Sequence, residues 1–181
     1  SRDEVEPGHS GFAHFFEHMM FRGTKRFPAE ARGELLTGLG VNESGSTTDD
    51  FTLYTLTGPS SALAQIIDLE ADRYQNLAYG VPAFKTESKA VLGEYNKSFS
   101  SPDMTTWEAL RGLAFDQHPY EHTVIGFKAD IEKMPERYDY AQQFFKRFYT
   151  PDNTLLVIAG DVDADAVIAL VKERFGSWQG K

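Results

Sequence analysis

Residues 10–23 read SGFAHFFEHMMFRG, and this stretch decides both the fold and the chemistry expected of the chain. Ser10 suits the N-cap position and Gly23 suits a stop signal, so the stretch predicts a helix over residues 10–22. At about 100° per residue, such a helix gathers its bulky apolar side chains on one side. These side chains are Phe12, Phe15, Phe16 and Met19. We therefore expect that side to pack against a core.

The opposite side of the same helix carries His14, Glu17 and His18. Histidines at positions i and i+4 project from one helix face, so both imidazoles can reach one metal ion. A catalytic zinc site needs three protein ligands and an open position for water, so a third donor is required. The alternative is that the pattern is a coincidence and that backbone carbonyls satisfy both rings.

A second helix, expected over residues 82–99, offers that third donor. Glu87 and Glu94 are seven residues apart, which places them two turns apart along one face. They border an apolar stripe made of Phe84, Val91 and Tyr95. Carboxylates at such a border are directed into a protected crevice, although both could also be solvated surface charges.

The remaining pattern predicts an α+β fold in one domain, with long helices on one face of a small mixed or antiparallel sheet. Helical periodicity and capping signals indicate further helices over residues 28–40, 60–77, 105–115, 135–149 and 166–175. Strands are expected at residues 50–57, which alternate and are rich in aromatic and β-branched types, and at 154–159, a continuous apolar run.

Composition excludes several classes of function. The chain has 181 residues with 27 acidic and 18 basic side chains, a formal net charge of −9, so it offers no basic surface for nucleic acid. No apolar stretch approaches the roughly 18–20 residues that span a bilayer, so we expect a soluble protein. Cysteine is absent, so any metal site must use His, Asp and Glu. The compartment stays undetermined, a bacterial periplasmic or secreted location being one option.

His14, Glu17 and His18 form the pattern H-x-x-E-H. In this pattern, and in the later Glu87 and Glu94, the chain resembles the pitrilysin/insulinase family of zinc peptidases, the inverzincins, whose mark is H-x-x-E-H. The resemblance implies that His14, His18 and Glu94 hold one Zn²⁺ per chain. It also implies that Glu17 takes the proton of a metal-activated water and that Glu87 orients a metal-bound histidine.

Further blocks in the family's order extend this resemblance over nearly the whole chain. They are Leu69–Arg73, His118–Tyr120, Tyr149–Asn153 and Gly160–Val162. One departure is the Ser44-Gly45 pair ahead of Ser46-Thr47, where the family usually has Asn-Gly or Asn-Ala. The resemblance implies that these four residues contact substrate. Family domains also start with one or two strands, so we expect residues 1–181 to be truncated at the N-terminus and to lack the family's second domain.

By this resemblance the chain is expected to be a zinc-dependent metalloendopeptidase that hydrolyses peptides or unfolded polypeptide segments. The alternative is a non-catalytic or substrate-presenting subunit of the same family. The implied partners are a peptide substrate and a second pitrilysin-like domain or subunit, which closes the chamber and supplies an arginine and a tyrosine that grip the peptide. We therefore expect the isolated chain to bind zinc but to cleave peptides slowly or not at all.

Overall fold

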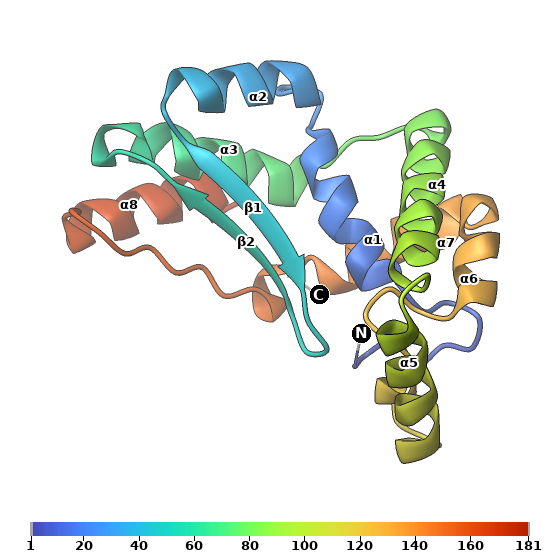
Figure 1. The fold of residues 1–181 in the computed structure, drawn as a ribbon. Coiled ribbons are helices and arrows are strands. Elements are labelled where there is room, and N and C mark those ends of the chain that lie inside the picture. The colour runs from blue at the N-terminus through green and yellow to red at the C-terminus, as the bar shows by residue number, and fades with distance from the viewer. Residues whose placement is uncertain (1, 181) are drawn as a thin grey trace. The chain divides into compact units, whose positions relative to one another are not determined.

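Eight α-helices and one two-stranded sheet are formed by residues 2–180, which the computed structural model describes (Figure 1). These residues divide into two compact units. The first unit comprises residues 2–19, 45–54 and 80–142, and the second comprises residues 20–44, 55–79 and 143–180. Short 3-10 turns lie at Met20–Arg22, Ser60–Ala62, Pro119–Glu121, Met134–Glu136 and Pro151–Asn153.

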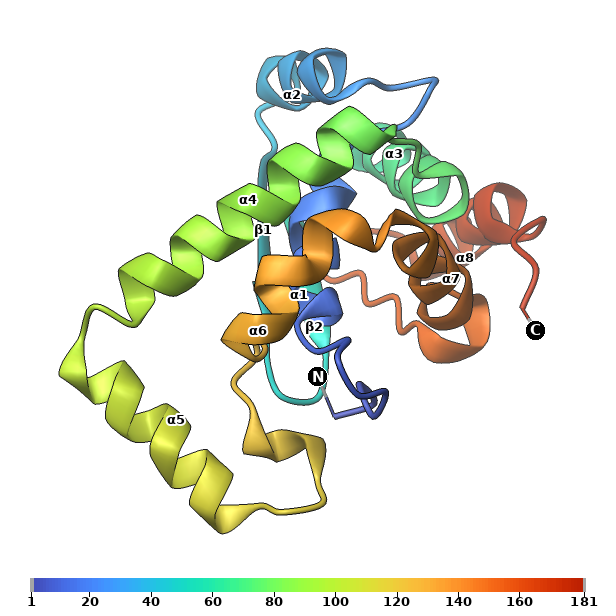
Figure 2. The same ribbon diagram turned by 90° about the vertical axis from the view of Figure 1, so that its right-hand side faces the viewer.

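The first unit is built on α1, which packs against α4, and on α6, which also packs against α4 (Figure 2). Its helices are α1 (Phe12–Met19), α4 (Val81–Ser98), α5 (Pro102–Ala114), α6 (Lys128–Lys133) and the first part of α7 (Tyr138–Phe148). The apolar side of α1 is fully buried, as the sequence predicts. Phe15 meets Phe84 of α4 edge to face, with ring centroids 5.1 Å apart. The α1 helix therefore packs its phenylalanines into a core to which α4 contributes.

The start of α1 differs from the sequence prediction. The helix begins at Phe12, and the Ser10 hydroxyl does not cap it but donates to Asp130 Oδ2 at 2.6 Å. Glu4 takes over part of the cap, because its Oε1 accepts from the Ala13 backbone N–H at 2.8 Å. Gly11 has a φ of 88°, and a Cβ there would lie 2.2 Å from the Ile125 carbonyl oxygen. Contacts distant in the sequence thus set the position of α1.

The second unit packs α3 (Leu63–Asn76) against α8 (Ala164–Phe175) and also contains α2 (Ala29–Gly38). Part of its core is an apolar cluster made of Leu36, Val41, Ala62 and Leu69, with Phe27, Leu39, Leu56 and Ile66 at its border. Two buried arginines are paired with acids: Arg32 contacts Glu43 and Glu70, and Arg73 contacts Glu70. Pairing of this kind offsets the cost of burying the charges.

The sheet is an antiparallel hairpin of β1 (Asn42–Thr47) and β2 (Thr52–Thr57). The sequence predicts β2 but not β1, whose residues are polar and lack β-branched types until its end. The predicted strand at 154–159 is wrong, because no residue there is in a strand and the Leu155 side chain is 86% exposed. A strand needs a partner for its backbone hydrogen bonds, and within residues 2–180 neither β1 nor β2 is paired with this segment.

The α+β class is confirmed: the chain is mostly helical with a small antiparallel sheet. The expected helices are present with ends shifted by a few residues, and the short α6 was not expected. None of the helices in residues 2–180 has both the length and the apolar character needed to cross a membrane.

Candidate metal centre

Three side chains from α1 and α4 converge at one point of the first unit. His14 and His18 come from α1 and Glu94 comes from α4, and one donor atom of each lies within 4.8 Å of the others. Glu94 Oε2 is 3.6 Å from His14 Nε2 and 3.3 Å from His18 Nε2. The Glu94 carboxylate therefore lies beside both imidazole rings. The structure therefore brings together the three residues expected to bind a metal.

The donor spacing fits a zinc ion. Zinc binds imidazole nitrogen and carboxylate oxygen at about 2.0–2.2 Å, so two ligands of a tetrahedral ion are about 3.3–3.5 Å apart. The two separations from Glu94 Oε2 to the histidine Nε2 atoms, 3.3 and 3.6 Å, match this spacing. Two imidazoles and one carboxylate also form a ligand set found in catalytic zinc sites, with a fourth position left for water.

His14 is the buried member of the cluster, whereas the Glu94 side chain is 43% exposed. Burial is the main cause that lowers the pKa of His14, and the neighbouring His18 adds to it, while Glu94, Glu17 and Glu4 oppose the shift. The lowered pKa favours the neutral imidazole near pH 7. A histidine must be neutral to bind a metal, so the environment favours the form that ligation requires.

Glu87 lies on the other side of His18 from Glu94. Its Oε2 is 3.3 Å from His18 Nδ1, and its side chain is buried. A carboxylate that accepts from Nδ1–H fixes the tautomer in which Nε2 carries the lone pair. The His18 ring is thus held with Nε2 toward Glu94, which is the arrangement predicted for a positioning residue.

Glu17 does not belong to the group of three donors but lies beside it on α1. Its Oε2 accepts a hydrogen bond of 2.6 Å from the hydroxyl of Thr47, at the end of β1. Thr47 Oγ1 also lies 3.3 Å from Thr52 Oγ1 on β2. The hairpin is further joined to α1 by the Tyr54 hydroxyl, which donates to the Phe16 carbonyl at 3.2 Å. The inner face of the hairpin therefore holds the Glu17 carboxylate.

The four residues expected to contact substrate do not lie together on one face. Along β1 the exposure alternates, so Ser44 and Ser46 are exposed while Gly45 and Thr47 are partly covered. Thr47 contacts Glu17, and its contact with a peptide stays a prediction. Sequence reasoning missed the link from Thr47 to Glu17, as well as Thr52 and Tyr54. The alternating residue types along β2 indicate that Thr52 and Tyr54 share one face of the strand. Nothing in the sequence places that face against α1.

The family is shown by comparison with known proteins. The model of the insulinase family, peptidase family M16, matches residues 1–128. The chain belongs to this family. The model of the peptidase M16 inactive domain matches residues 137–181.

Relatives of this insulinase-family chain are named as zinc proteases. An uncharacterized zinc protease of Mycobacterium leprae is 30% identical over 177 residues, which cover 98% of this chain and 39% of the relative. The zinc protease PqqE of Helicobacter pylori is 29% identical over 178 residues, which cover 98% and 39%. This chain thus spans about two fifths of the length of these relatives.

Two solved structures share the fold. A protease from Helicobacter pylori superimposes with a TM-score of 0.94 at 29% identity, covering all of this chain and 43% of that protein. The first half of the periplasmic protease PqqL from Escherichia coli gives a TM-score of 0.77 at 23% identity, covering 96% of this chain and 38% of that one. The second likeness supports the fold alone.

Proposed function

We propose that this chain is the metal-binding domain of a zinc-dependent endopeptidase that hydrolyses peptides or unfolded polypeptide segments. The observation that carries the proposal is the convergence of His14, His18 and Glu94 beside a further acid, Glu17, that the ion does not need as a ligand. The names of the relatives, zinc proteases, support the same metal and the same class of reaction.

Each polar residue of the site has a separate task in this proposal. When zinc is bound, it supplies a water nucleophile near neutral pH and polarises the scissile carbonyl. Glu17 acts as the general base that takes the water's proton and then delivers it to the leaving amine. Thr47 holds the Glu17 carboxylate by a hydrogen bond, and Glu87 holds the His18 ring.

Metal content is the first test. Freshly purified, tag-free protein is expected to contain one zinc per chain by elemental analysis, because the three donors are already close together without an ion. The matched control is His118→Gln, which removes an exposed histidine that also lies four residues from a second one, His122. The control should keep the parent's zinc. Less than about half an equivalent of zinc, not restored by added metal, would contradict the proposal.

Hydrolysis separates this proposal from the alternative of a non-catalytic subunit. Such a subunit could keep the fold and even the zinc, but it would not cleave an unstructured peptide. Full-length protein that holds one zinc per chain and leaves a diverse set of peptides intact would therefore favour the non-catalytic role.

We further propose that the active enzyme needs a second pitrilysin-like half. Residues 1–181 alone are expected to fold and bind zinc but to cleave peptides at least about a hundred-fold more slowly than the full-length protein. The reason is that the second half is needed to position the peptide and to shield the site from bulk water. The measurement compares kcat/KM for the two proteins on one peptide, with circular dichroism as the check on folding. Equal cleavage by residues 1–181, abolished by Glu17→Gln, would contradict the need for a second half and support the catalytic assignment.

A further inference from the structure

The α5 helix of the first unit is held mainly by polar contacts: Glu108 accepts hydrogen bonds from the Tyr95 hydroxyl of α4, and Arg111 makes the buried contacts. Arg111 is the one residue of α5 that is buried, at 7% exposure. The apolar side chains of the same helix, Trp107, Leu110 and Leu113, are exposed. A helix usually buries its apolar side chains and leaves its arginines in water. In α5 the arrangement is reversed, so Arg111 is buried through its polar contacts and not through the packing of an apolar helix face.

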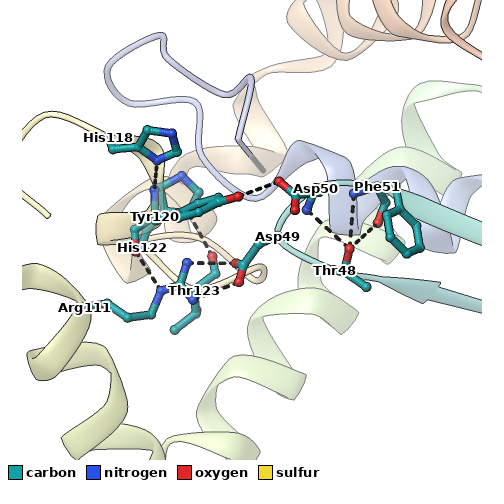
Figure 3. Close-up of polar contacts among 9 residues, drawn as sticks. All are labelled: Thr48, Asp49, Asp50, Phe51, Arg111, His118, Tyr120, His122 and Thr123. Atoms are coloured by element: carbon teal, nitrogen blue, oxygen red, sulfur yellow. Dashed lines mark hydrogen bonds and ion pairs between the residues drawn. The ribbon is translucent and has the colours of Figure 1, made fainter. Parts of the chain in front are cut away.

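The Arg111 guanidinium binds the turn between β1 and β2 (Figure 3). Its Nη1 and Nη2 donate to the two carboxylate oxygens of Asp49 at 3.1 and 2.8 Å, and its Nε donates to the Tyr120 carbonyl at 2.7 Å. Paired, charge-assisted hydrogen bonds of this kind fix orientation as well as distance. Lysine cannot reproduce them, because it presents a point charge.

Asp50, the neighbouring acid of the turn, is bound by Tyr120, the residue whose carbonyl accepts from Arg111. The Tyr120 hydroxyl donates to Asp50 Oδ1 at 2.5 Å, and this hydrogen bond is the main cause that raises the pKa of Tyr120. The turn is also closed internally, because the Thr48 hydroxyl accepts from the backbone N–H groups of Asp50 and Phe51. Asp49 and Asp50 therefore belong to a turn that its own hydrogen bonds close and that Arg111 and Tyr120 bind through their side chains, while Arg2 donates its backbone N–H to the Asp49 carbonyl.

The turn that Arg111 binds directly follows Thr47, which contacts Glu17. Thr47 is two residues before Asp49, and its hydroxyl donates to the Glu17 carboxylate. A shift of the turn moves the end of β1 and with it the Thr47 hydroxyl. We propose that Arg111 is a positioning residue that acts through Asp49 and Thr47 to hold the Glu17 carboxylate. This inference rests on the proposed function, in which Glu17 is the general base.

The test replaces Arg111 in the full-length zinc-loaded protein. Arg111→Gln and Arg111→Lys are both expected to lower kcat on an unstructured peptide by about ten- to a hundred-fold, because small misplacements of a catalytic group have effects of that size. KM and zinc content should stay within about two-fold of the parent. Leu113→Ala is the matched control on α5, since it trims an 87% exposed side chain, and it should keep the parent's kcat.

Two further measurements separate positioning from a merely structural role. Backbone amides of residues 47–52 should exchange hydrogen faster in Arg111→Gln, while amides of α4 keep their protection. Thr47→Val should lower kcat, whereas Thr47→Ser, which keeps the hydroxyl, should retain the parent's kcat. The double variant Thr47→Val with Arg111→Gln should lose no more kcat than the more damaging of the two single variants.

The outcomes distinguish this inference from the function on which it rests. A parent protein that holds zinc and cleaves nothing would contradict the proposed function. An active parent whose Arg111→Gln variant keeps the parent's kcat, or whose two single effects simply multiply, would overturn the role of Arg111 alone.

Discussion

Replacing Glu17 with glutamine is expected to lower kcat for peptide hydrolysis by about a thousand-fold, since a positioned general base contributes about a hundred- to ten-thousand-fold. The variant should keep one zinc per chain, because Glu17 is not among the three converging donors. Loss of activity with the metal retained is the combination that assigns Glu17 to proton transfer rather than to metal binding.

The choice of glutamine keeps the local structure. The glutamine side-chain oxygen can accept the Thr47 hydrogen bond that Glu17 Oε2 accepts now, so the hairpin should stay in place. The amide cannot take a proton near neutral pH. The fall in kcat should therefore come without a large change in KM or in melting temperature.

The measurement is kcat and KM of the full-length protein on an unstructured peptide, with zinc measured in the same sample. Glu136→Gln is the matched control, because it makes the same substitution at an exposed glutamate of the first unit. If Glu17→Gln kept more than about a tenth of the parent's kcat, general-base catalysis by Glu17 would be wrong.

The sequence places the candidate metal-binding side chains on common helix faces because the relevant spacings are short-range. His14 and His18 are one helical turn apart, and Glu87 and Glu94 are two turns apart, so each pair is placed by helix geometry alone. The one long-range step, that Glu94 lies beside His14 and His18, is implied by the family resemblance, because apolar stripes show that both helices bury a face but not that they pack against each other. Phe15 and Phe84 make that contact in the structure.

Features that depend on distant partners could not be predicted in the same way. Ser10 has the right type for an N-cap, but its hydroxyl binds Asp130, 120 residues later. The apolar run from Leu155 has the composition of a buried strand, yet it is exposed, and within residues 2–180 neither β1 nor β2 is paired with it. The polar strand β1 is formed because β2 pairs with it, so its own composition gives little signal.

Loss of Glu94 is expected to weaken metal binding strongly. Glu94→Gln replaces an anionic oxygen ligand with a neutral amide, and zinc affinity should fall by at least about a hundred-fold, since even the loss of a residue that only orients a ligand costs about ten- to a hundred-fold. Hydrolysis should fall to the background rate, because the ion that supplies the nucleophile is no longer held.

Glu87→Gln gives the internal comparison on the same helix. Glu87 contacts His18 Nδ1 and is not one of the three converging donors, so its loss should weaken zinc binding by about ten- to a hundred-fold and should be rescued by excess zinc. Competition with a chelator of known affinity measures all three proteins, with Glu136→Gln again as the control. The structure thus predicts the order parent, Glu87→Gln, Glu94→Gln from tightest to weakest. A weaker affinity for Glu87→Gln than for Glu94→Gln would exchange the two roles, making Glu87 the ligand from α4 and leaving Glu94 as its neighbour.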